Sequence, residues 1–111
     1  MLSRAEITRA ALRILDDQAH EDLSVYRLAS MIGISERTLR SAFEEYFGMS
    51  PARYLKVRTL HRARSILKWS DPDAVNVTEV AVGLGIWELG RFSHDYKMLF
   101  NELPSETLRR N

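Results

Sequence analysis

Polar side chains recur on one side of the segment between residues 36 and 47. When this segment is drawn as an α-helix, Arg37, Arg40 and Ser41 lie opposite Leu39 and Phe43. An arginine guanidinium is a planar fork of donors, so it can bond the O6 and N7 atoms of guanine in the DNA major groove. The sequence therefore offers two guanine-binding side chains within the first turns of one predicted helix.

The residues before this segment predict a short helix and a tight turn. Four apolar residues recur at helical spacing and form one face: Val25, Leu28, Ala29 and Ile32. Ser24 can cap this helix, and Gly33 stands where a left-handed residue would end it. Ile34 is an apolar residue in the turn, and Ser35 can cap the next helix. The pattern is typical of a helix-turn-helix motif, although an ordinary pair of packed helices would also produce it.

The pattern occurs a second time, beginning at Asn76. The apolar face, the glycine and the apolar turn residue are matched in order by Val77, Val80, Ala81, Leu84, Gly85 and Ile86. After the turn the spacing between the copies grows by one residue, and Phe92, Tyr96, Phe100 and Pro104 match Leu39, Phe43, Phe47 and Pro51. Helical periodicity alone would not repeat the glycine and the turn residue. The internal repeat therefore favours the helix-turn-helix interpretation.

A long helix is predicted between the two copies. Ser50 and Pro51 supply an N-cap and a first helical residue, and the helix should run to about Trp69, before Pro72. Roughly 18 residues make a rod of about 27 Å, close to the ~34 Å of one DNA turn. Such a rod could set two recognition helices into successive major grooves. Residues 51–70 also carry six basic side chains and no acid, whereas residues 71–111 carry four basic and seven acidic ones.

Apolar spacing also predicts which face of each helix is packed. The first helix opens with a capping box of Ser3 and Glu6 and ends near Asp17, before a polar link at residues 18–23. Its packing face consists of Ile7, Ala10, Ala11, Ile14 and Leu15. The inward residues expected later are Leu39, Ala42, Phe43, Tyr46 and Phe47 in the first motif, Leu55, Leu60, Ala63, Ile66 and Leu67 in the linking helix, and Leu89, Phe92, Tyr96, Leu99 and Phe100 in the second motif.

Taken in order, these segments resemble the DNA-binding domain of the AraC/XylS family of bacterial transcriptional regulators. The resemblance covers roughly residues 5–108 and is carried by Leu28-Ala29, Gly33-Ile34-Ser35, Phe47-Gly48-Met49-Ser50-Pro51, Arg58, Leu60, Ala63 and Leu67, and the second copy up to Pro104-Ser105-Glu106-Thr107. The sequence departs from the family at Ile86, usually Phe, at Trp87, often a small polar residue, and at Asn101, usually Gly. Trp87 leaves the N-cap of the second recognition helix unassigned.

The resemblance implies an all-α fold of about seven helices, with helix-turn-helix subdomains at residues 1–50 and 70–111 joined by a linking helix at residues 51–69. It implies DNA contacts from Arg37, Arg40 and Ser41, with Thr38 between them, and from Leu89, Gly90, Arg91 and His94 in the second motif. Since Leu89 and Gly90 are poor hydrogen-bonding residues, we expect Arg91 and His94 to be the main polar readers there. Ser24, Asn76 and Lys97 are weaker candidates for phosphate contacts.

The implied function is sequence-specific binding of double-stranded promoter DNA by a transcriptional regulator. The expected location is the bacterial cytoplasm, and the nucleoid when DNA is bound. RNA polymerase is an expected partner. Family members usually join this domain to an N-terminal effector-binding or dimerisation domain that this chain lacks, so the chain is either a C-terminal domain or a small stand-alone member. The alternative is a helical protein-interaction module, and the salt dependence of DNA affinity separates the two.

No feature of the sequence favours an enzyme, and no cofactor is expected. The chain has no cysteine and three dispersed histidines, so it offers no thiolate nucleophile and no clustered acid–base group. An acidic cluster with one histidine is interpreted as a solvated loop rather than a metal site, since no second cluster converges on it: Asp16, Asp17, His20, Glu21 and Asp22.

Nucleotide loops and membrane segments are not indicated either. Gly83, Gly85 and Gly90 do not match the dinucleotide fingerprint and follow a helix rather than a strand. The longest apolar run, from Val80 to Trp87, is far below the ~20 residues of a membrane helix. The N-terminus lacks the basic and apolar regions of a signal peptide.

Overall fold

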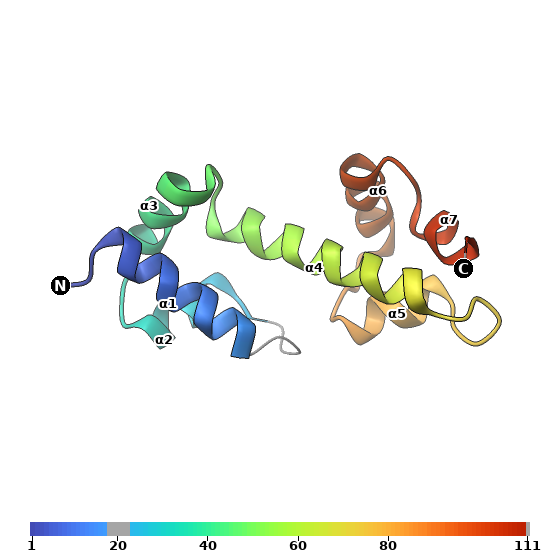
Figure 1. The fold of residues 1–111 in the computed structure, drawn as a ribbon, viewed down its shortest axis with the longest axis horizontal. Coiled ribbons are helices and arrows are strands. Elements are labelled where there is room, and N and C mark those ends of the chain that lie inside the picture. The colour runs from blue at the N-terminus through green and yellow to red at the C-terminus, as the bar shows by residue number, and fades with distance from the viewer. Residues whose placement is uncertain (18–22, 111) are drawn as a thin grey trace. The chain divides into compact units, whose positions relative to one another are not determined.

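The computed structural model describes residues 1–17 and 23–110, and this part of the chain is helical (Figure 1). Its helices are α1 (Arg4–Asp17), α2 (Val25–Ile32), α3 (Glu36–Phe47), α4 (Pro51–Trp69), α5 (Val77–Gly83), α6 (Leu89–Phe100) and α7 (Pro104–Arg109). No strand occurs among the described residues. The predicted all-α class with about seven helices is confirmed.

Two compact units divide the chain: unit 1, from Met1 to Val57, and unit 2, from Arg58 to Asn111. The boundary falls within α4, so the first turns of this helix belong to unit 1 and its later turns to unit 2. The three-part division that the sequence analysis favours, with a separate linking helix at residues 51–69, stays a prediction.

Side-chain caps fix where several of the helices begin. At the start of α1 the Glu6 N–H donates to Ser3 Oγ at 3.1 Å and the Ser3 N–H donates to Glu6 Oε1 at 2.9 Å, which is the predicted capping box. Four later side chains each accept a hydrogen bond from the backbone N–H three residues on: Ser24, Ser35, Ser50 and Asn76. These bonds satisfy amides that the first helical turn leaves without a partner.

The turn of the first motif recurs in the second. Gly33 and Gly85 both adopt the left-handed backbone conformation, with φ of 87° and 79°. The residue after each glycine donates its N–H to an alanine carbonyl in the preceding helix, from Ile34 at 3.1 Å and from Ile86 at 2.9 Å. The repeat in the sequence is therefore also a repeat of backbone geometry.

The core of unit 1 lies where α1, α2 and α3 meet. Its buried residues are Ile7, Ala11, Leu28, Ala29, Leu39, Ala42 and Phe43. The ring of Phe43 meets those of Phe47 and Tyr54 edge to face, with centroids 5.1 and 5.3 Å away. This packing uses one face of α3 and leaves the opposite face to solvent.

The core of unit 2 holds α6 in the same manner. Its buried residues are Leu60, Ala63, Leu67, Val80, Ala81, Phe92, Tyr96 and Leu108, which come from α4, α5, α6 and α7. Phe100 packs against this core, and the Arg64 guanidinium lies 5.1 Å from the centre of its ring. One of the six basic side chains in residues 51–70 is thus engaged in a cation–π contact.

Three residues predicted to face inward are exposed instead. Tyr46 is 51% exposed, Ile66 39% and Leu99 36%. Tyr46 and Leu99 occupy equivalent positions in the last turns of α3 and α6, and Ile66 lies at the edge of the apolar face of α4. Helical periodicity gives the direction of a side chain but not how far the neighbouring elements extend.

The polar link predicted before α2 contains a buried residue. Leu23 is buried, with 7% of its surface exposed, so the chain enters α2 through an apolar anchor. The remainder of that link, residues 18–22, lies outside the described residues.

Candidate nucleic-acid interface

The outer face of α3 presents the predicted residues of the first motif. Arg37, Thr38 and Arg40 are exposed and Ser41 is half-buried. Thr38 is part of the helix cap, because its Oγ1 accepts a hydrogen bond from Ser35 Oγ at 2.9 Å. Ser41 Oγ donates to the carbonyl of Arg37 at 3.3 Å. The two arginines are therefore the side chains on this face with unused donors.

Arg40 has an acid one turn away in each direction. Glu36 and Glu44 share a shallow recess with it, yet no ion pair links Arg40 to either carboxylate in the part of the chain that the structure describes. Arg37 likewise forms no ion pair with a described residue. Both guanidinium groups are available to an external acceptor.

The second recognition helix begins differently from the first. The N-cap of α6 is Glu88, with φ −95° and ψ 83°, and its side chain makes no capping hydrogen bond. This agrees with the departure noted at Trp87, whose side chain is 77% exposed beside the cap. The first amides of α6 thus lack the side-chain partner that Ser35 gives to α3.

The four predicted contact residues of α6 do not share one environment. Leu89 is half-buried and packs against the core of unit 2, so only part of its surface is left for contact with a thymine methyl group. Gly90, Arg91 and His94 are exposed. Leu89 was predicted both to face inward and to contact DNA, and its packing favours the inward position.

Gly90 has no structural reason to be glycine. Its φ is not left-handed, and a Cβ built on it would meet no atom within 4 Å. Glycine within a helix costs about 1 kcal/mol relative to alanine. A glycine at such a position leaves room for a ligand to approach the backbone closely.

Arg91 forms an ion pair that was not predicted from the sequence. Its Nε lies 3.5 Å from Oδ2 of Asp95, one turn later in α6. The spacing of four residues on one helix face is the signal that would have found this pair.

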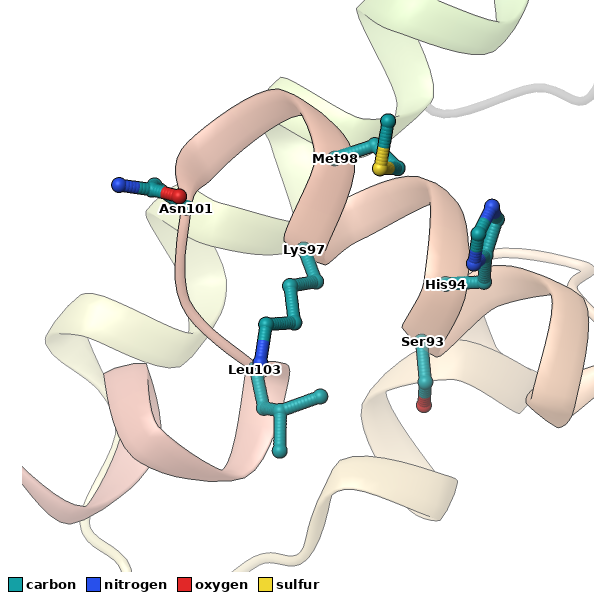
Figure 2. Close-up of a pocket in the computed structure, with 6 residues that line it drawn as sticks. All are labelled: Ser93, His94, Lys97, Met98, Asn101 and Leu103. Carbon is teal, nitrogen blue, oxygen red and sulfur yellow. The ribbon is translucent and has the colours of Figure 1, made fainter.

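A shallow recess adjoins the exposed face of α6. It has a volume of about 470 Å³ and is lined by Ser93, His94, Lys97, Met98, Asn101 and Leu103. The Lys97 side chain extends along the surface toward Leu103 (Figure 2). Asn101 ends α6 in the left-handed conformation with φ 63°, the position at which the family usually has Gly. Lys97 itself is exposed.

The other phosphate candidates are engaged in capping. Ser24 Oγ accepts from the Arg27 N–H at 3.1 Å, and Asn76 Oδ1 accepts from the Glu79 N–H at 2.8 Å. Each side chain therefore caps the helix that it precedes.

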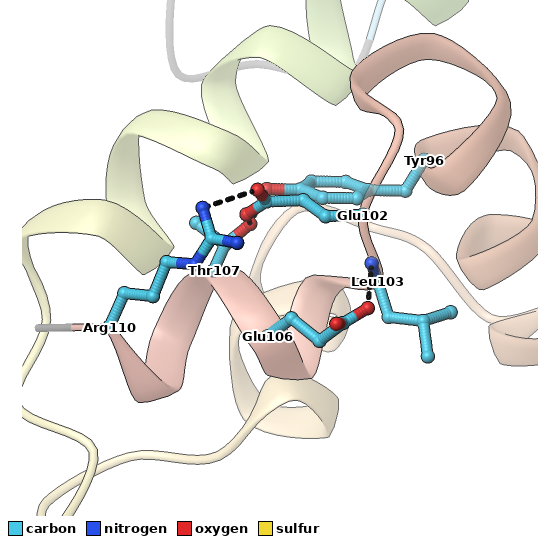
Figure 3. A network of polar contacts seen from close by, with 6 residues as sticks. All are labelled: Tyr96, Glu102, Leu103, Glu106, Thr107 and Arg110. Carbon is cyan, nitrogen blue, oxygen red and sulfur yellow. Dashed lines mark hydrogen bonds and ion pairs between the residues drawn. The ribbon is translucent and has the colours of Figure 1, made fainter.

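A network of polar side chains links α6 to the turn and helix that follow it (Figure 3). The Tyr96 hydroxyl, fully buried, donates to Thr107 Oγ1 at 2.8 Å, and the Thr107 hydroxyl donates to Glu102 Oε2. The other oxygen of Glu102 pairs with Arg110 at 3.0 Å. Burial raises the pKa of the Tyr96 phenol above its ordinary value. The sequence predicts Tyr96 as an apolar anchor, and the structure adds this polar link from α6 to α7.

Metal and membrane features can be assessed over residues 1–17 and 23–110. No group of three or more His, Asp or Glu side chains there is arranged to hold a metal ion. His20, Glu21 and Asp22 of the acidic cluster lie outside these ranges. None of the described helices is long and apolar enough to cross a membrane.

Known proteins are similar to this chain in both sequence and fold. A protein-family profile described as a helix-turn-helix domain matches residues 28–110. The probable thc operon regulatory protein of Rhodococcus erythropolis is 38% identical over 103 residues, which are 93% of this chain and 31% of that protein. The chain belongs to the AraC/XylS family of transcriptional regulators. The resemblance inferred from the residues is confirmed, as is its assignment to DNA-binding regulators rather than enzymes.

Two further relatives agree with this assignment. The XylDLEGF operon transcriptional activator 3 of Pseudomonas putida is 39% identical over 101 residues, 89% of this chain and 30% of that protein. The crystal structure of a probable AraC family transcriptional regulator from Rhodopseudomonas palustris CGA009 superposes with a TM-score of 0.81 at 31% identity and covers 94% of this chain and 95% of that one. The chain spans about three-tenths of the length of these curated relatives.

Proposed function

We propose that this AraC-type domain reads promoter DNA as a single chain, with α3 and α6 in two successive major-groove segments. Arg37 and Arg40 read the first segment, and Arg91 and His94 read the second. The observation that carries the proposal is the repeated presentation of cations. In each copy of the repeated turn, the helix that follows exposes basic side chains that are not part of the hydrophobic core.

The chemistry of these side chains suits the major groove. Arg37 and Arg40 lie in the first two turns of α3, where side chains of a recognition helix reach base edges, and neither guanidinium is held by an ion pair with a described residue. A bidentate arginine–guanine contact contributes about 1–3 kcal/mol of discrimination against another base. His94 can donate to a guanine or to a phosphate from its exposed position.

The helix starts and Lys97 serve as phosphate contacts in this proposal. Backbone N–H groups at a helix N-terminus attract anions, and those of α6 lack a side-chain cap. Gly90 leaves room for the DNA backbone beside them. Ser24 and Asn76 contribute mainly through the helix starts that they cap.

The wider context is also part of the proposal. Because the relatives are bacterial operon regulators of about three times this length, we infer that the domain acts beside an N-terminal effector-binding or dimerisation domain. RNA polymerase is the expected partner at a promoter, and the bacterial cytoplasm and nucleoid are the expected location. The predicted separation of subdomains by residues 51–69 supplies the spacing between the two grooves.

The test is selection of binding sites from random duplex DNA, followed by the mass of the selected complex. We expect one chain on an asymmetric site with two unlike boxes about one DNA turn apart, roughly 34 Å. The affinity should fall steeply with salt, because each phosphate contact releases counterions. An obligatory dimer on a palindrome would contradict the single-chain proposal. Failure to select any sequence, with little salt dependence, would favour the protein-interaction alternative.

A further inference from the structure

The ion pair on α6 is asymmetric in its surroundings. The Arg91 side chain is 67% exposed, whereas the Asp95 side chain is only 14% exposed. Most of the Asp95 side chain is thus covered by neighbouring atoms, whereas most of the Arg91 side chain is in contact with solvent.

The pair contributes to stability, because a mostly covered carboxylate requires a partner, but its arginine is mostly in solvent. The order of the two residues, cation before anion, is also the weaker of the two arrangements on a helix. A carboxylate near a DNA-reading face repels phosphates. The arrangement is therefore unfavourable for binding DNA in general, and an orienting effect on Arg91 would offset this cost.

The contacting atom is compatible with an orienting role. Asp95 approaches Nε of Arg91, the guanidinium nitrogen next to the aliphatic stem. The two terminal amino groups can form the fork that bonds guanine O6 and N7. A side chain held in its bound orientation loses less rotamer freedom on binding.

We propose that Asp95 is a positioning residue that holds the Arg91 guanidinium for guanine recognition in the second box. The inference rests on the proposed reading role of Arg91 and adds the residue that sets its specificity. The first motif provides the contrast, because Arg40 also has an acid four residues later, Glu44, without an ion pair between them. The two motifs thus differ in how firmly their arginines are held.

The experiment compares Asp95→Asn with Glu44→Gln on a selected duplex and its single-base variants at fixed salt. Both substitutions remove one negative charge beside a reading arginine, but only the first removes a contact. We expect Asp95→Asn to reduce discrimination at the base pair read by Arg91 by about fivefold to tenfold, within the range of one bidentate contact. Its affinity for other duplexes should be unchanged or higher, because a phosphate-repelling charge is lost. Glu44→Gln should keep the wild-type discrimination in both boxes.

A double-mutant cycle separates positioning from a structural role. If Asp95 acts through Arg91, Asp95→Asn should not change discrimination in an Arg91→Ala background. A purely structural role would lower the melting temperature and weaken all duplexes alike in both backgrounds, which would overturn the inference. Full wild-type discrimination in Asp95→Asn would overturn it as well and leave the proposed function standing. A wild-type protein that selects no DNA sequence would instead contradict the proposed function, and this inference with it.

Discussion

Phe43 is the side chain whose removal tests the architecture of unit 1 most severely. It is fully buried in the core where α1, α2 and α3 meet, with two aromatic neighbours at 5.1 and 5.3 Å. Burial of a phenylalanine side chain contributes about 1.5–3 kcal/mol, and each edge-to-face pair adds about 0.5–1.5 kcal/mol. Phe43→Ala should therefore lower the free energy of unfolding by about 3–5 kcal/mol, as in cores that cannot collapse around the cavity.

A loss of this size is a large part of the roughly 5–15 kcal/mol that stabilises a natural domain. The assay is denaturant unfolding followed by circular dichroism, which reports the helices of both units. Tryptophan fluorescence reports unit 2 alone, because Trp69 and Trp87 both lie there. The matched control is Tyr46→Ala in the last turn of the same helix, where the side chain is half exposed and the effect should be within about 0.5 kcal/mol. Equal effects of the two substitutions would refute the assignment of the packed face of α3.

Two other substitutions separate stability from DNA binding. Gly90→Ala should raise the free energy of unfolding by about 0.5–1 kcal/mol and weaken DNA binding severalfold. The control Gly83→Ala, equally free of clashes, should stabilise the protein without changing its affinity for DNA. Equal affinities of the two variants would show that Gly90 does not lie against the DNA backbone. Tyr96→Phe should cost about 1 kcal/mol at neutral pH through the lost bond to Thr107. Because the pKa of Tyr96 is raised in the folded protein, its contribution is complete below about pH 10 and is lost as the pH rises through the raised value, so melting temperatures of wild type and Tyr96→Phe should converge in strong alkali.

Local signals in the sequence predict much of this fold. Helix starts depend on a cap and the amide three residues later, and turns depend on one glycine, so Ser24, Ser35 and Gly33 suffice to place the first motif. The repeat adds a second, independent copy of the same signals. Exposure at Tyr46 and Leu99 could not be predicted in this way, because it depends on where the packing partners end.

Tertiary contacts account for the remaining differences at the candidate site. The link from Tyr96 to Thr107 joins α6 to α7 across a turn whose geometry no periodicity encodes. The pair of Arg91 and Asp95 was accessible from spacing alone, yet its bearing on recognition depends on the unequal exposure of the two side chains. That inequality arises from the three-dimensional packing around α6.

In the proposed function, α3 and α6 each read DNA through an arginine on the outer face. The most direct test measures affinity for every single-base variant of a selected duplex, at fixed salt, with wild type, Arg40→Ala and Arg91→Ala. We predict a loss of about 1–3 kcal/mol for each variant, with base preference relaxed in one box by Arg40→Ala and in the other box by Arg91→Ala. Uniform weakening of binding to all duplexes would mean that the arginines contact phosphates rather than bases. If both variants keep the wild-type affinity and profile, the outer faces of these helices are not the DNA-reading surface.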